Sequence, residues 1–236
     1  MLSFLASLRA LAAGAALAAC GVLSAAPLQV PDTMAQRMQA CAACHGKEGR
    51  STNQGWFPRI AGKPAGYLFN QLANFRDGRR SNATMTYLVD QMSDAYLHDI
   101  ADYFAGLQLP YPPPQPADVD TTALARGQAL VQRGDPQRGI PACVACHGTA
   151  MTGVLPATPG LLGLPRDYLV GQFGNWRNGL RRAAAPDCMA QITQRLGPQD
   201  IGDLANWLAA QPLPADSRPV PALPGPLPLR CGSVPP

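Results

Sequence analysis

Cys41-Ala42-Ala43-Cys44-His45-Gly46 recurs 102 residues later as Cys143-Val144-Ala145-Cys146-His147-Gly148. A second set of matches follows at an offset of 101, pairing Gly62, Tyr67, Gln71, Asn74, Arg76 and Gly78 with Gly163, Tyr168, Gln172, Asn175, Arg177 and Gly179. A third set at an offset of 104 pairs Met85, Asp99, Ala101 and Tyr103 with Met189, Asp203, Ala205 and Trp207. Three ordered sets at nearly constant offset indicate a duplicated domain, with short insertions or deletions in its loops.

Each hexapeptide contains C-x-x-C-H, the attachment motif of c-type haem. The two thiols add across the haem vinyl groups, and the adjacent histidine becomes the proximal iron ligand. A redox or zinc cysteine pair is the alternative for a lone C-x-x-C, but a histidine directly after both copies argues against it. The sequence therefore predicts two haem c groups. Their predicted attachment residues are Cys41, Cys44, Cys143 and Cys146, and their predicted proximal ligands are His45 and His147.

Each iron also needs a sixth ligand or an open site. The third histidine, His98, has a glycine at its repeat position and is expected to be a surface residue. Met85 lies 40 residues after His45, and Met189 lies 42 residues after His147. A methionine thioether favours ferrous iron and raises the reduction potential. Met85 and Met189, expected in loops that lead to a helix, are therefore the predicted axial ligands.

The N-terminus has the layout of an export signal. Arg9 is its only charge before Asp32, and an apolar stretch too short to span a bilayer follows it. Residues 17–20 match a lipobox in which Cys20 would be lipidated, whereas cleavage after Ala26 is the alternative. Both interpretations predict a periplasmic protein, with contact to the membrane only through a lipid anchor.

The predicted organisation is a signal at 1–26, a first domain at 27–109, a Pro-rich linker at 110–121, a second domain at 122–211 and a Pro-rich tail at 212–236. The linker is expected to form a polyproline II spacer that holds the domains apart. Apolar residues three and four apart predict helices over 66–76 and 167–177, and helices are also expected from Ser93, Thr122 and Gly197. No stretch alternates as a strand does, so the predicted fold is all-α.

Charge and the remaining cysteines add further expectations. The formal net charge is +4 without any basic run, so no nucleic-acid partner is expected. Two arginine clusters repeat, and they are expected to be solvated helix ends, with pairing to haem propionates or an acidic partner as the alternative: Arg76, Arg79 and Arg80, and Arg177, Arg181 and Arg182. Cys188 and Cys231 are left over, and an oxidising compartment favours a disulfide between them over two separate thiols.

These residues resemble the dihaem cytochrome c4 family over most of 33–211. The resemblance rests on the residues 140–143 that lead into the second haem motif and on Gly-x-Pro-x-x-Tyr-Leu at 62–68 and 163–169. It also rests on each methionine preceding a helix start by eight residues. It implies two class I cytochrome c domains, each wrapped round one covalent haem c, with the haems near each other across a pseudo-twofold interface. It further implies that Gly127 lets the terminal helices of a domain cross closely against Leu204 and Trp207. A short first helix and the Pro-rich tail depart from the pattern.

The resemblance implies a single-electron carrier to or from a respiratory oxidase, reductase or dehydrogenase, and not an enzyme. Two axial methionines favour this interpretation because a carrier needs saturated irons. One alternative is a cytochrome subunit of a membrane dehydrogenase or oxidase complex. Another is a sulfur-oxidising dihaem enzyme similar to thiosulfate dehydrogenases, in which the Cys188 thiolate would ligate the second iron and lower its potential.

Overall fold

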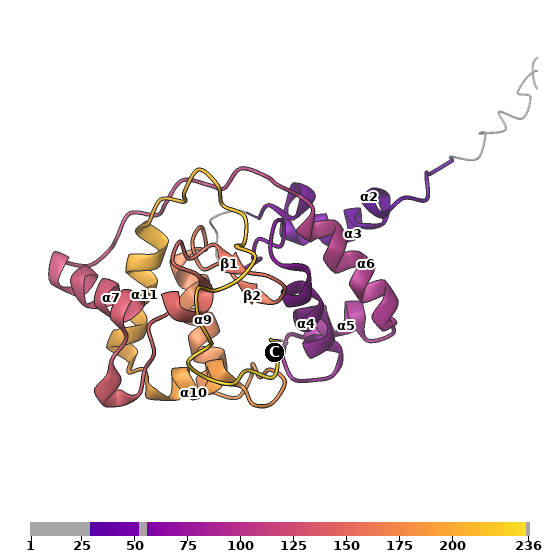
Figure 1. Ribbon diagram of the computed structural model, residues 1–236. Helices are drawn as coiled ribbons and strands as arrows, with labels where there is room; N and C mark the ends of the chain where they lie inside the picture. The colour runs from indigo at the N-terminus through magenta and orange to yellow at the C-terminus, as the bar shows by residue number, and fades with distance from the viewer. Residues whose placement is uncertain (1–28, 52–55, 235–236) are drawn as a thin grey trace, which may run out of the picture. The chain divides into compact units, whose positions relative to one another are not determined.

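The computed structural model describes residues 29–51 and 56–234 (Figure 1). The first half contains α2 (Met34–Arg37), α3 (Gln39–His45), η1 (Lys47–Gly49), α4 (Ala65–Arg76), α5 (Ala83–Val89) and α6 (Asp94–Ala105). The second half contains α7 (Thr121–Arg133), η2 (Pro136–Arg138), α8 (Val144–His147), β1 (Gly153–Val154), β2 (Thr158–Pro159), α9 (Arg166–Arg177), α10 (Cys188–Arg195) and α11 (Pro198–Ala210). The all-α prediction is confirmed, with one exception: β1 and β2 form a short antiparallel hairpin.

The predicted export signal and lipobox, with Cys20, lie outside the described residues. The compact unit that contains both haem motifs begins at Thr33. Within the described chain, no helix is both long enough and apolar enough to cross a bilayer.

Each half of the sequence builds its own hydrophobic core. In the first half α4 packs against α6, and Leu97 and Phe104 of α6 are fully buried. In the second half α11 packs against α7 and α9, and Leu204 and Leu208 occupy the centre of the core. The sequence duplication thus appears as two separate apolar clusters.

The predicted helix starts at Ser93 and Gly197 are confirmed, and the third helix begins at Thr121, one residue before its predicted start. The Ser93 hydroxyl accepts from the N–H of Tyr96, and the Asp120 carboxylate accepts from the N–H of Ala123 at 2.7 Å. Before α11, the Asp200 carboxylate accepts from the N–H of Gly197 at 2.7 Å. Each bond satisfies an N–H group that the first turn of a helix leaves unpaired.

The close crossing of α7 and α11 depends on Gly127. A Cβ atom at this position would lie 2.3 Å from the Asp203 carbonyl oxygen and 3.1 Å from Cβ of Trp207. Only glycine leaves room for the two backbones, so the predicted close approach is confirmed.

The Pro-rich linker does not hold the halves apart, which corrects that expectation. The halves are hydrogen-bonded directly, from Ser81 N–H to the Leu180 carbonyl and from Arg182 N–H to the Arg79 carbonyl, both at 2.7 Å. The linker lies on the second half, where Gln115 N–H donates to the Ala209 carbonyl at 2.9 Å. A PPII segment makes no internal hydrogen bonds, so its backbone N–H and C=O groups can bond to a neighbouring surface. The domain boundaries at 109 and 122 stay predictions.

The Pro-rich tail, drawn in yellow in Figure 1, crosses the second half without forming a helix. Val220 exchanges backbone hydrogen bonds with Gly153 and Leu155, both at 2.9 Å. At its end, Gly232 N–H donates to the Pro186 carbonyl, and the Ser233 carbonyl accepts from the Asn70 side chain of α4 at 3.0 Å. The tail is therefore fastened to both halves.

Candidate haem sites

The two motif histidines occupy equivalent places in the two halves. His45 ends α3 and His147 ends α8, and both rings are buried. The glycine after each has a positive φ, 77° at Gly46 and 82° at Gly148, a conformation that glycine adopts at little cost. The chain therefore turns away immediately after each histidine.

A backbone carbonyl holds each imidazole. His45 Nδ1 lies 2.8 Å from the Pro58 oxygen, and His147 Nδ1 lies 2.7 Å from the Pro159 oxygen. An Nδ1–H that donates to a carbonyl leaves Nε2 unprotonated and able to bind a metal. The sequence analysis missed both prolines, although they are 101 residues apart and therefore share the offset of the second set of repeated residues.

Burial also favours the neutral imidazole that ligation requires. It is the largest cause that lowers the pKa of His45 and of His147, against the carbonyl hydrogen bonds that raise both values. The charge of Lys63 lowers the pKa of His147 further.

The four motif cysteines form no disulfide with one another or with the other described cysteines. Burial raises the pKa of Cys41, and it raises the pKa of Cys143 to about 12. Neither pair belongs to a group of three or more metal-binding side chains in the part of the chain that the structure describes. Cys41, Cys143 and Cys146 are partly buried and Cys44 is exposed, and each pair lies beside a motif histidine, an arrangement that suits covalent haem attachment.

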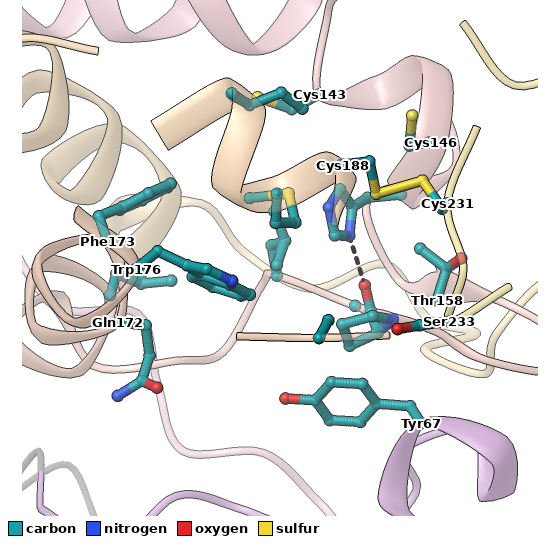
Figure 2. A pocket seen from close by; sticks show the side chains of 18 of the residues that line it. Tyr67, Cys143, Cys146, Thr158, Gln172, Phe173, Trp176, Cys188, Cys231 and Ser233 are labelled. Atoms are coloured by element: carbon teal, nitrogen blue, oxygen red, sulfur yellow. Dashed lines mark hydrogen bonds between the residues drawn. A yellow bond between two sulfur atoms is a disulfide. The ribbon is translucent and has the colours of Figure 1, made fainter. Parts of the chain in front are cut away.

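A cavity lies between α8, α9, α10, α11 and the tail of the second half, and first-half residues, Lys63 and Tyr67 among them, line one side of it (Figure 2). Cys143, Cys146, His147 and Met189 all line it. The rest of its wall is largely apolar and includes Leu169, Phe173, Trp176, Ile192, Leu204 and Leu208. An apolar wall around one histidine and one methionine fits a haem, whose flat ring is hydrophobic and whose iron takes two axial ligands.

In the first half, Cys41 and Met85 both pack against the core formed around Leu97 and Phe104. The structure corrects the expectation that the two methionines lie in loops, because Met85 belongs to α5 and Met189 to α10. Both helices are short and begin at a side-chain cap: Asn82 accepts from Met85 N–H at 3.0 Å, and Asp187 accepts from Ala190 N–H at 2.9 Å. Asn and Asp are common N-caps, so the signal was present in the sequence.

His98 is exposed, as expected, and its ring stacks on Phe69 with centroids 3.8 Å apart. It lies on the outer side of α6, whereas Leu97 and Ile100 of the same helix enter the core.

Two of the repeated arginines are buried at the contact between the halves, so the prediction of solvated helix ends is wrong for Arg80 and Arg181. Each guanidinium donates to the side-chain oxygens of both Gln71 and Gln172, at distances of 2.7–3.0 Å. Their backbones form an antiparallel bridge. Sequence spacing could not show this, because the burial of each arginine comes from the opposite half.

The two buried guanidiniums lack an anionic partner in the described parts of the chain. Ion pairs are seen for other arginines, but neither Arg80 nor Arg181 pairs with a carboxylate. Burial, and then the charge of Arg80, lowers the pKa of Arg181. Arg80 also approaches the Tyr168 hydroxyl, and Arg181 approaches the Tyr67 hydroxyl, at 3.4 and 3.3 Å.

Cys188 and Cys231 form a disulfide with their Cα atoms 5.1 Å apart, visible as the yellow bond in Figure 2. A sulfur in a disulfide is not a thiolate, which argues against Cys188 as an iron ligand. The bridge joins the first residue of α10 to the tail, and Leu227, Leu229 and Ser233 of the tail line the same cavity.

Comparisons with known proteins agree with this arrangement. Residues 35–108 match the family model of cytochrome c. The chain is 33% identical over 170 residues to cytochrome c4 of Pseudomonas aeruginosa, covering 71% of this chain and 82% of that protein. It belongs to the cytochrome c4 family. Like its cytochrome c4 relatives, it is a dihaem electron carrier with two covalently bound haem c groups.

One further relative and two solved structures are also similar to this chain. A protein of Thiomonas intermedia called thiosulfate dehydrogenase electron acceptor is 38% identical over 175 residues, covering 74% of this chain and 79% of that protein. Reduced cytochrome c4 from Pseudomonas stutzeri has a TM-score of 0.62 at 29% identity, covering 74% and 94% of the two chains. A thiosulfate dehydrogenase structure from Marichromatium purpuratum has a TM-score of 0.65 at 33% identity, covering 73% of this chain but 36% of that one.

Proposed function

We propose that this cytochrome accepts single electrons from a thiosulfate dehydrogenase and passes them to a further redox protein. The observation that supports this partner is the similarity to proteins named as electron acceptors of that enzyme. A solved thiosulfate dehydrogenase also contains a stretch that resembles this chain. Both likenesses extend over the two halves and are therefore more than a shared haem motif.

The proposed ligands are His45 and Met85 for the first iron, and His147 and Met189 for the second. Each haem, when bound, supplies an iron that alternates between the ferric and ferrous states. The chain attaches it through two thiols, holds one axial imidazole through a proline carbonyl and surrounds the second ring with apolar side chains. With two protein ligands on each iron there is no open coordination position for a substrate, so we propose a carrier and not an enzyme.

Arg80 and Arg181 are proposed to bind haem propionates. Two buried cations that share two neutral glutamines leave positive charge uncompensated, and a buried charge is costly without a partner. Propionates would supply the missing negative charge, and guanidinium groups bind carboxylates through paired hydrogen bonds. The alternative of an acidic docking partner is less suitable because both guanidiniums are buried.

Localisation in the periplasm follows from the export signal expected in residues 1–26. Lipidation of Cys20 would tie the protein to the membrane and would also suit a cytochrome subunit of a membrane complex. The similarity to a thiosulfate dehydrogenase structure also supports the sulfur-oxidising alternative, but not a Cys188 ligand, because that sulfur is bonded to Cys231.

Reduction kinetics test the carrier role and its partner. With purified thiosulfate dehydrogenase and thiosulfate, the absorbance of reduced haem should rise, whereas thiosulfate alone should leave the cytochrome oxidised. Reduction by thiosulfate alone would show a catalytic site and overturn the carrier assignment. No reduction in the complete mixture would overturn the proposed donor.

The ligands are tested separately with Met85→Ala and Met189→Ala. Each variant should retain two haems and lower one of the two reduction potentials, because each loses the thioether that favours ferrous iron. If both variants keep the wild-type spectrum and potentials, the axial assignment is wrong.

A further inference from the structure

Lys63 belongs to the first half but is buried against the second. Its side chain is 4% exposed, and Nζ donates to the Gly160 carbonyl at 3.2 Å. Gly160 directly follows Pro159, whose carbonyl oxygen lies 2.7 Å from His147 Nδ1. The ammonium is therefore one residue from the group that holds the proposed proximal ligand of the second haem.

Lys63 also borders the second haem cavity, together with His147 and Met189. No ion pair joins Lys63 to a carboxylate in the described parts of the chain, and Tyr111 presents its ring at 5.8 Å. Charges in such a poorly solvated place are weakly screened, so they act on neighbouring groups over longer distances than at the surface.

The repeat does not provide the first haem with the same lysine. Gly62-Lys63-Pro64 aligns with Gly163-Leu164-Pro165, so the residue equivalent to Lys63 is an apolar side chain in the second core. Arg59 also borders the second cavity, but its guanidinium is hydrogen-bonded to the carbonyls of Ala61, Leu109 and Pro110. Replacing Arg59 would release the start of the linker, whereas Lys63 makes a single hydrogen bond across the interface.

We propose that Lys63 of the first half is a positioning residue for the second haem. Its bond to Gly160 holds the backbone next to Pro159, whose carbonyl binds His147, and its positive charge raises the reduction potential of this haem. The proposal rests on ligation of the second iron by His147. An electron that enters this haem converts Fe³⁺ to Fe²⁺ and lowers the positive charge of the site by one unit. A fixed cation nearby therefore favours the reduced state and raises the reduction potential of this haem.

The test is a spectroelectrochemical titration of the holoprotein in which the two haems are resolved. Lys63→Gln should lower the ratio of reduced to oxidised second haem at a given applied potential about tenfold, which corresponds to about 59 mV for one electron. Lys63→Met, which keeps the length and is apolar, should lower it similarly. Lys63→Arg should stay near the wild-type value because it keeps the charge.

The control is Lys47→Gln, since Lys47 is the only other lysine of the chain and is exposed. It removes the same charge and should leave the second haem unchanged. The Met189→Ala variant identifies which titration step belongs to that haem.

The proposal is overturned if Lys63→Gln and Lys63→Met leave the second potential unchanged, or if they shift both haems equally. Haem content and the His–Met spectrum are measured first on wild-type protein. These measurements distinguish a failure of the Lys63 proposal from a failure of the proposed ligands. Wild-type protein without a second His–Met haem would refute the ligand assignment and not the effect of Lys63.

Discussion

Replacing Cys231 by serine should destabilise the second half and open its haem cavity. The Cys188–Cys231 bridge spans 43 residues, and closing such a loop is worth about 4 kcal/mol in the chain-entropy model. For a chain of this size, that corresponds to a fall in melting temperature of roughly 8–16 °C. The backbone bonds of Val220 remain after the bridge is cut and restrain the tail in part, so the lower end of this range is expected.

The opening should be confined to the second haem. Leu227 and Leu229 of the tail line that cavity, and the bridge joins the tail to the residue that precedes Met189. A freed tail exposes this side of the site, so cyanide should bind the second ferric haem faster. The first haem should keep its rate, because Thr84 occupies the position equivalent to Cys188.

Thermal melting and stopped-flow cyanide binding measure the two effects. Cys188→Ser and the double variant Cys188→Ser/Cys231→Ser should match the single Cys231→Ser variant, because any of the three removes the same bond. An unchanged melting temperature together with an unchanged cyanide rate would refute the reasoning. So would labelling of both cysteines by a thiol reagent in unfolded, unreduced wild-type protein.

Two further predictions concern the second half. Gly127→Ala should lower the melting temperature, because the added methyl group overpacks the helix crossing at Asp203 at a cost of about 1–3 kcal/mol of stability. The control Gly171→Ala, in a helix with open space around this position, should raise the melting temperature. Equal effects of the two variants would contradict this account. Asp200→Asn should flatten the acid dependence of the melting temperature. The bond to Arg138, at 2.6 Å, is the largest cause that lowers the pKa of Asp200 in the folded protein. The pair therefore stabilises the fold fully above the ordinary carboxyl pKa of about 4, and this contribution is lost as the pH falls from there through the lowered pKa. A variant with the wild-type slope below pH ~4 would show that this pair does not contribute.

Much of the fold could be predicted because its signals are local and repeated. C-x-x-C-H, the caps at Ser93 and Gly197 and the spacing of apolar residues each depend on neighbours within a few positions. Met85 and Met189 stay predicted ligands, chosen because each lies eight residues before the next predicted helix. The short helices around them were missed because each has at most eight residues and begins at a polar cap inside a loop-like sequence.

The polar contacts between the two halves could not be predicted, because the partners lie 92–110 residues apart in the sequence. Arg80 and Arg181 lie in arginine-rich segments that follow a helix and are typical of exposed helix ends. They are buried because the opposite half packs against them. Lys63 likewise follows a glycine in an ordinary turn, and its carbonyl partner is 97 residues further along. Pro58 and Pro159 act through backbone oxygens, which no side-chain motif records.

The crossed arginines give the contact between the halves the form of an isologous interface within one polypeptide. Arg80 binds Gln172 and Arg181 binds Gln71, so one pair of contacts is used twice, as in a twofold homodimer. Covalent connection through residues 110–120 makes this association intramolecular, with an effective concentration in the millimolar range for a short tether. The interface therefore does not need the area or the affinity of a free dimer. Each half can acquire its own substitutions, as at Lys63 and Leu164, without losing its partner.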